Sequence, residues 1–305
     1  MTETCPRCQY IRIPTDKGPT WQCPNCGAAY NKRLHTTLNT PANEKKPNSF
    51  LDLEAQYRPL NRKLYFFIVI FAGLTLFSAL KKNDLIDFSL INPQLTQEPA
   101  QELISSRSAF SEPHSFQYMD IQYQIKPIAN YELWGLVVSH NDIDGISDTY
   151  HDETSVDTKD LCVIWGENIL SNNYQAVSYS SGAWTCYFEY PHGTVFNPDQ
   201  LSNNHIITDN DAIRETLSQI QIGDQIHIKG ELVSYQDERH PEYWRTSSTT
   251  RTDGGNGACE VIFANELDIL AVGNPTWRII YGLSWKILIV LLIAKTVVFI
   301  REVTQ

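Results

Sequence analysis

Two long apolar runs interrupt an otherwise mixed sequence of 305 residues. The first, Leu64 to Leu80, contains no charged residue and is bounded at each end by a pair of basic residues. As a helix it spans roughly 26 Å at about 1.5 Å per residue, and the basic side chains can extend outward to match a hydrocarbon core of about 30 Å. We predict a transmembrane helix over residues 63–81.

The second run, Trp277 to Glu302, is interrupted by Lys286 and Lys295. A lysine at the centre of a membrane helix costs about 2.5–3.5 kcal/mol, but these two lie toward opposite ends, so each can reach its nearer surface. We predict a second transmembrane helix over 278–301, with an interfacial or packed helix as the alternative. The two lysines suggest that this segment packs against another helix.

Between these runs lie several strand-like stretches, which predict β-strands. They are Tyr131–Val138, Leu161–Gly166, Trp184–Tyr190, Gly223–Gln236 and Cys259–Leu270, and the third and fourth of them alternate polar and apolar residues. Over Thr208–Ile220 the period changes to that of a helix, with Thr208 or Asp209 available as its N-cap. We therefore predict a mainly antiparallel β domain over 116–275.

Three strands, a helix and two strands is the order of an OB-fold, a small five-stranded barrel. The stretch "GDQIHIKGELVSY" resembles the fourth strand of bacterial OB-fold domains, with Gly230 where a strand can bend. The resemblance implies an OB-fold-like barrel, and a β-sandwich is the alternative. Two polar, proline-dotted segments flank the first apolar run, and we interpret 34–62 as a linker and 82–115 as a stalk.

Charge is divided unevenly between the two sides of the first apolar run. Residues 1–63 carry ten Lys and Arg against five Asp and Glu, whereas 83–276 carry eight against twenty-nine. The positive-inside rule places both termini in the cytoplasm and the β domain in the periplasm of a bacterial inner membrane. An acidic domain repels phosphates, so no nucleic acid is expected there.

Four cysteines near the amino end form two Cys-x2-Cys pairs fourteen residues apart: Cys5, Cys8, Cys23 and Cys26. This spacing lets four thiolates close a tetrahedron around one metal ion, which replaces the core that about thirty residues cannot build. Gly27 can take positive φ in the second pair, whereas Gln9 stands at the equivalent position of the first. We predict a structural zinc ribbon over residues 1–33.

The stretches "CPRCQY" and "GPTWQCPNCGAAY" resemble the rubredoxin-type zinc ribbons found at the amino end of bacterial membrane proteins. Rubredoxin itself carries iron and transfers electrons. The loop between the cysteine pairs is too short for rubredoxin and lacks most of its aromatic cluster. Zinc is therefore expected, with iron as the alternative.

Two loops of the β domain are candidate sites. Asn141–Glu153 is acidic and could hold calcium, although its residues do not fit the EF-hand register. Arg245–Cys259 is rich in glycine and hydroxyls, and its Arg245, Arg251 and Asp253 form a candidate ligand or partner site. A plain hydrophilic loop is the alternative for both.

Cys162, Cys186 and Cys259 permit three disulfide pairings, each leaving one thiol. The sequence contains no recognised catalytic motif, and the β-domain histidines show no metal-ligand spacing. We therefore expect a non-enzymatic, membrane-anchored scaffold or tether between a cytoplasmic protein and an extracytoplasmic partner or ligand. The alternatives are a redox protein with a rubredoxin-like iron site, and an envelope enzyme with an unrecognised site in the β domain.

Overall fold

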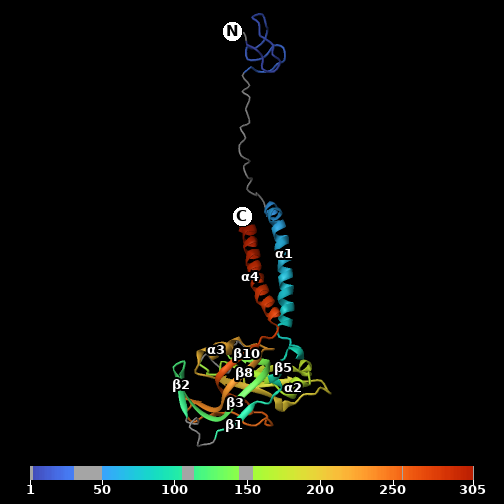
Figure 1. The fold of residues 1–305 in the computed structure, drawn as a ribbon. Helices are drawn as coiled ribbons and strands as arrows, with labels where there is room; N and C mark the ends of the chain where they lie inside the picture. The colour runs from blue at the N-terminus through green and yellow to red at the C-terminus, as the bar shows by residue number, and fades with distance from the viewer. Residues whose placement is uncertain (1–2, 31–49, 105–112, 144–153, 256, 305) are drawn as a thin grey trace. The chain divides into compact units, whose positions relative to one another are not determined.

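The computed structural model describes residues 3–30, 50–104, 113–143, 154–255 and 257–304 (Figure 1). It divides into two compact units, Met1–Tyr57 with Glu302–Gln305, and Arg58–Arg301. The first unit contains the cysteine pairs. The second contains the apolar helices and the β domain.

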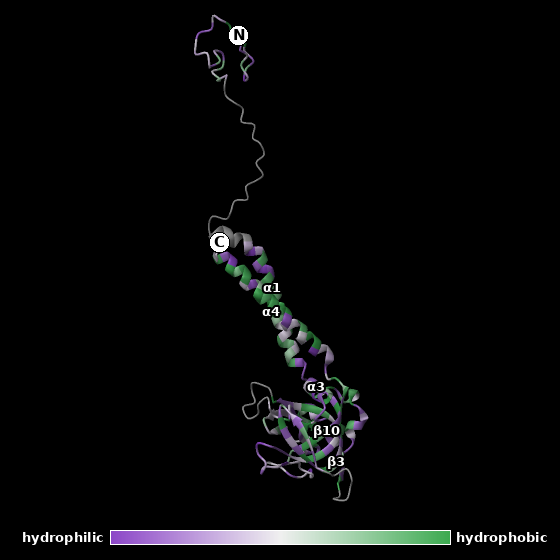
Figure 2. Cartoon of the chain, turned by 90° about the vertical axis from the view of Figure 1, so that its left-hand side faces the viewer, coloured by the Kyte–Doolittle hydropathy of each residue, from purple (hydrophilic) through white to green (hydrophobic). Residues whose placement is uncertain are grey.

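Two helices carry the apolar runs: α1, Phe50–Lys81, and α4, Pro275–Thr304. Both are long and apolar enough to cross a membrane, judged by length and composition alone. Their apolar residues are the green stretches of Figure 2. Helix α1 begins inside the segment that we interpreted as a linker, so the apolar run continues a longer helix.

The two helices contact each other through small and polar side chains. Thr75 donates a hydrogen bond to Ser284 (Oγ1 to Oγ, 3.0 Å), and Lys295 donates to Asn61 (Nζ to Oδ1, 2.8 Å). Such pairs are favourable in lipid because they satisfy polar groups that hydrocarbon cannot. The expected packing of α4 against another helix is thus seen at Lys295.

The β domain contains ten strands among the described residues. They are β1 Ala100–Leu103, β2 His114–Tyr118, β3 Ile121–Asp142, β4 Lys159–Ile164, β5 Ser178–Gly182, β6 Thr185–Glu189, β7 Leu201–Ile207, β8 Gln225–Asp237, β9 Arg245–Thr246 and β10 Glu260–Ala271. Two short helices precede β1: η1 Phe88–Leu90 and η2 Pro93–Thr96. Four more lie between the strands: α2 Glu167–Leu170, η3 Tyr174–Ala176, η4 Pro198–Gln200 and α3 Asp211–Gln219.

Eight of these strands form one sheet in the order β1-β3-β4-β7-β10-β8-β9, with β2 and β8 also paired to β3. The pairings are antiparallel except for β7 with β10, which is parallel. The prediction of a mainly antiparallel β domain is confirmed. Its largest core cluster lies among β3, β4, β7, β8, β10 and α3, and includes Tyr131, Leu133, Leu161, Trp165, Ile206, Leu217, Ile228 and Ile262.

Four strands of this sheet, β1, β2, β7 and β9, were not predicted, and β7 was missed because its sequence is polar. Strand β7, "LSNNHII", buries Asn203, Asn204 and His205, whose side chains are satisfied by hydrogen bonds. The aromatic run Trp184–Tyr190 forms β6, but β6 pairs with β5 in a separate two-stranded sheet. Alternating hydrophobicity therefore predicted a strand correctly but not its place in the sheet.

The structure refines two predictions, the N-cap of α3 and the role of Gly230. The side chain of Asn210 caps α3 by accepting from the Ala212 N–H, while Thr208 accepts from the Asn210 N–H one step earlier. Gly230 lies where β8 passes closest to β10, because an added Cβ would lie 2.1 Å from the Phe263 carbonyl oxygen. A register shift in β10 follows at Ala264/Glu266.

The segment expected as a stalk lies against the β domain where it is described. Leu95 is fully buried, the Asn92 N–H donates to Gln225 Oε1 (2.6 Å), and Trp165 Nε1 donates to Glu98 (2.8 Å). Apolar residues between the prolines explain this packing, because they gain more by burial than by exposure.

Both helices join the β domain at one place. The buried carboxylate of Asp224 pairs with Arg278 of α4 (2.7 Å) and accepts from the Gly273 N–H (2.8 Å). Asn274 donates to the carbonyl oxygen of Asp84, just after α1. The two helix junctions are thereby fixed to each other.

Candidate functional site

The cysteine pairs form two knuckles of the same design. In the first, the Cys5 N–H donates to the Tyr10 carbonyl (2.9 Å) and a short antiparallel bridge joins Thr4 to Ile11. In the second, Cys23 donates to the Ala28 carbonyl (2.8 Å) and a bridge joins Gln22 to Ala29.

The fourth residue after each leading cysteine has a left-handed backbone. Gly27 has φ +71° and Gln9 has φ +59°, so the first knuckle adopts the same turn without a glycine. This conformation is strained for Gln9, because its Cβ crowds the backbone at positive φ.

The four sulfur atoms converge as tetrahedral metal ligation requires. The Sγ atoms of Cys5 and Cys26 are 3.6 Å apart, those of Cys8 and Cys23 are 3.7 Å apart, and all four lie within 4.8 Å of one another. Zn–S bonds of about 2.3 Å predict a tetrahedral edge of about 3.8 Å. We call this group the cysteine knot, and its geometry fits a metal ion.

The surroundings of the knot act differently on its cysteines: the Ala28 N–H lowers the pKa of Cys26, but contact with Cys8 and burial outweigh it and raise that pKa to about 12. Burial opposes ionisation of Cys23, yet the N–H groups of Cys26 and Asn25 donate to its sulfur and lower its pKa to about 6. Arg12 holds the intervening loop by donating to the carbonyl oxygens of Gly18, Pro19 and Gln22 at 2.8–2.9 Å. A metal ion held by four thiolates has no open coordination position, so such a site would be structural rather than catalytic.

A cavity of about 660 Å³ opens in the β domain. Its lining comes from β6 and β9 with the residues just before each, from the segment before β10 and from the start of β10: Trp184, Thr185, Tyr243, Trp244, Arg245, Thr246, Gly255, Gly257, Cys259 and Val261. The Arg245 guanidinium lies over the Trp184 ring, 4.4 Å from its centroid. An aromatic surface with one cation can bind a flat or acidic ligand group.

The three residues of the predicted ligand loop take separate roles. Arg245 lines the cavity, but Arg251 turns inward, where it pairs with Glu260 and lies over the rings of Tyr131 and Trp165. Asp253 accepts a hydrogen bond from Ser248 (2.6 Å). Among the described residues no hydrogen bond or ion pair joins these three side chains, and Arg251 packs against the core.

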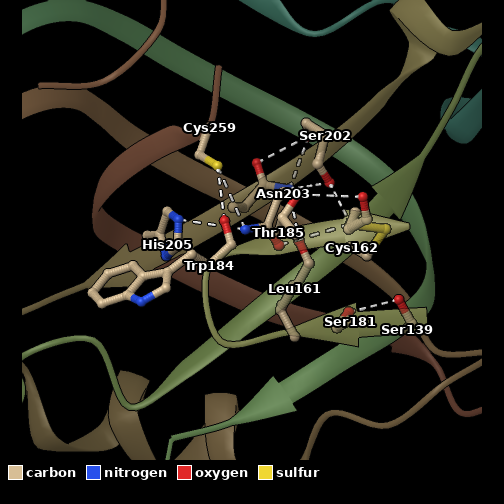
Figure 3. The surroundings of a disulfide bond; sticks show 12 residues. Ser139, Leu161, Cys162, Ser181, Trp184, Thr185, Ser202, Asn203, His205 and Cys259 are labelled. Atoms are coloured by element: carbon tan, nitrogen blue, oxygen red, sulfur yellow. Dashed lines mark hydrogen bonds between the residues drawn. A yellow bond between two sulfur atoms is a disulfide. The ribbon is translucent and has the colours of Figure 1, made fainter. Parts of the chain in front are cut away.

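Cys162 and Cys186 form a disulfide, and Cys259 is a free thiol (Figure 3). Strand β7 lies between the strands that carry these two cysteines. Cys162 of β4 is opposite Asn203 of β7, and Cys259 comes one residue before Glu260 of β10, which is opposite Asn204 of β7. Cys162 and Cys259 are thus two strands, about 9.6 Å, apart, too far for a disulfide, whose Cα atoms lie within about 7 Å. Burial raises the pKa of the Cys259 thiol, which lowers its share of the nucleophilic thiolate form.

Most of the acidic loop Asn141–Glu153 lies outside the described residues. Of its first residues, Asp142 pairs with Lys159 (2.9 Å), which is itself buried and donates to the carbonyl of Ile220. That pairing gives Asp142 a structural role. The calcium hypothesis otherwise stays a prediction.

The sequence does not reveal one cluster of potential metal ligands. Asp157, Asp160 and His205 bring three potential metal ligands together, although we found no metal spacing among the histidines. The signal was absent because His205 is separated from Asp160 by 45 residues and meets it only across two paired strands.

No protein-family model, no curated protein and no solved structure matches this chain. Its functional assignment therefore rests on its own residues.

Proposed function

We propose that the chain is a membrane-anchored, non-enzymatic scaffold. Its cysteine knot binds zinc and docks a cytoplasmic protein, and its β domain docks an extracytoplasmic partner or ligand. The two apolar helices cross the bacterial inner membrane and keep both termini in the cytoplasm.

The observation that carries this proposal is the contrast in cysteine chemistry on the two sides of the apolar helices. The amino-terminal unit holds four unpaired cysteines within reach of one ion, whereas the β domain pairs Cys162 with Cys186. Thiolate metal sites suit a reducing compartment and disulfides suit an oxidising one. A membrane between the two regions reconciles both.

The junction at Asp224 supports a tethering role. The Asp224–Arg278 pair and the Asn274–Asp84 hydrogen bond join the domain to both helices at a single place. The cavity lies near Cys259 and Val261, at the opposite end of β10 from the start of α4. Twelve strand residues span about 36 Å, so a partner at the cavity would meet the domain well away from the membrane.

We also propose that the β domain is an OB-fold-like barrel. The pairings β3–β4, β4–β7, β7–β10, β10–β8 and β8–β3 return to the strand from which they start, and α3 lies between β7 and β8. The parallel pairing of β7 with β10 also supports this assignment over a β-sandwich.

Photo-crosslinking in cells tests the scaffold directly. A photoreactive residue replaces Trp21 in the amino-terminal unit or Tyr243 beside the cavity, whose side chains are 57% and 67% exposed. We expect different crosslinked proteins at the two positions. Cys23→Ser should abolish only the first product and Arg245→Ala should weaken only the second. Identical products at both positions, or none at either, would contradict the scaffold.

Metal identity separates the scaffold from the redox alternative. We expect the full chain, purified in detergent from cells given both metals, to hold zinc at the knot and to be colourless. Loss of one zinc ion per chain when all four knot cysteines become serine supports the scaffold. Iron with thiolate charge-transfer bands would instead support electron transfer.

A further inference from the structure

We propose that Asp157, Asp160 and His205 form a second metal site, which binds a divalent transition metal inside the β domain. We call these three residues the buried cluster. The site is independent of the cysteine knot and of the scaffold function proposed above.

The sheet itself brings the buried cluster together. Asp160 of β4 and His205 of β7 are directly opposite in the antiparallel register, so their side chains leave the same face. Asp157 lies two residues before the start of β4. Ladder hydrogen bonds on both strands therefore fix two of the three donors before any ion arrives.

The donor atoms converge on one imidazole nitrogen. His205 Nδ1 lies 2.6 Å from Asp160 Oδ1 and 3.7 Å from Asp157 Oδ2, and one donor atom from each residue lies within 4.8 Å of the others. Ligands on a tetrahedral ion with bonds of about 2.1 Å lie about 3.4 Å apart. An ion therefore fits if His205 Nδ1 and Asp160 Oδ1 move apart by less than about 1 Å.

The ligand types select a class of metal. One imidazole nitrogen with two carboxylates suits Zn²⁺, Mn²⁺, Fe²⁺ or Co²⁺, whereas calcium and magnesium prefer oxygen ligands alone. All three side chains are at most 4% exposed. Such burial protects a bound ion from exchange and indicates a structural role, joining the start of β4 to β7.

Asn203 can orient the imidazole for metal binding. Its Nδ2 lies 3.4 Å from His205 Nε2 and 3.6 Å from Cys259 Sγ (Figure 3). A metal on Nδ1 leaves the imidazole proton on Nε2, which then needs an acceptor. A half-turn of the Asn203 amide supplies its oxygen to Nε2–H, and the same oxygen can accept from the Cys259 thiol.

The test uses the full chain in detergent with Cys5, Cys8, Cys23 and Cys26 changed to serine, so that the knot contributes no metal. We expect about one zinc per chain after purification with Zn²⁺. Co²⁺ should give d–d bands without thiolate charge transfer, because no thiolate is a ligand. Adding Asp157→Asn, which nearly preserves shape, should lower the affinity for Zn²⁺ at least tenfold. The control His192→Ala changes an exposed histidine and should leave binding unchanged.

A second measurement covers the case in which the serine variant does not fold. The chain with an intact knot should hold two zinc ions, and its Asp157→Asn variant one. The unfolding temperature of the β domain shows whether the Asp157→Asn variant is folded. If that temperature is the same as in the parent chain and neither zinc content nor Co²⁺ binding changes, the proposal is overturned. It is also overturned if the folded serine variant shows no saturable binding of Zn²⁺ or Co²⁺.

Discussion

The cysteine knot and the β domain achieve order in opposite ways. Within residues 3–30 only Cys5 and Cys23 are buried, so two knot cysteines are the whole buried core of this segment. The β domain buries dozens of apolar side chains across several strands, and its disulfide is one contact among many. Loss of a single residue should therefore abolish the first structure and only weaken the second.

The largest expected effect is that of removing one thiolate from the knot. Cys23→Ser should release the metal and unfold residues 3–30, because a structural zinc site supplies about 10–16 kcal/mol of folding free energy. NMR spectra of the full chain in detergent should lose the dispersed signals of this segment alone. Cys259→Ser is the matched control and should change neither region much. A folded, metal-bound Cys23→Ser variant would contradict the comparison.

Removing the disulfide tests the expectation that loss of one feature only weakens the β domain. Changing both Cys162 and Cys186, which are 24 residues apart, to serine should lower the free energy of unfolding of the β domain by about 3.5 kcal/mol. The domain should stay folded, because its core strands remain. Urea unfolding followed by tryptophan fluorescence measures the change. If the double variant is unfolded in buffer, the β domain depends on its disulfide as the amino-terminal segment depends on its cysteines, and the comparison fails.

A buried carboxyl makes the stability of the β domain depend on pH. Burial raises the pKa of Glu260 from 4.5 to about 7, despite the opposing Arg251 guanidinium. The native state then keeps a proton that the unfolded state releases, so stability falls as pH rises from about 4.5 to about 7. The loss is about 3 kcal/mol. Glu260→Gln should flatten this slope, whereas Glu238→Gln, at an exposed position, should not. An unchanged slope in Glu260→Gln would assign the pH dependence elsewhere.

The smallest effect concerns the asymmetry between the two knuckles. Gln9→Gly should stabilise metal-bound residues 3–30 by about 1 kcal/mol, because glycine adopts φ +59° without a Cβ clash. Gly27→Ala, at φ +71° in the second knuckle, should destabilise them by a similar amount. Competition with a chelator reports both changes. Equal metal affinities in all three proteins would show that the turn stores no strain.

The sequence predicted the parts of the molecule whose chemistry is local. The Cys-x2-Cys pairs place their sulfur atoms through a single turn each, and the two apolar runs need only length and composition. Strand β7 was missed because buried Asn203, Asn204 and His205 look like surface residues until their hydrogen-bond partners are known. The buried cluster was missed for the same reason, since the pairing of β4 with β7 decides which residues meet.

The separation of the two regions by a membrane is the central claim, and reporter fusions test it most directly. A cytoplasmic reporter and a periplasmic reporter are each fused after Asn43 and, in a second pair, after Asp199. We predict that the cytoplasmic reporter is active only at Asn43 and the periplasmic reporter only at Asp199. Activity of the cytoplasmic reporter at Asp199 would place the disulfide and the knot in one compartment and contradict the account.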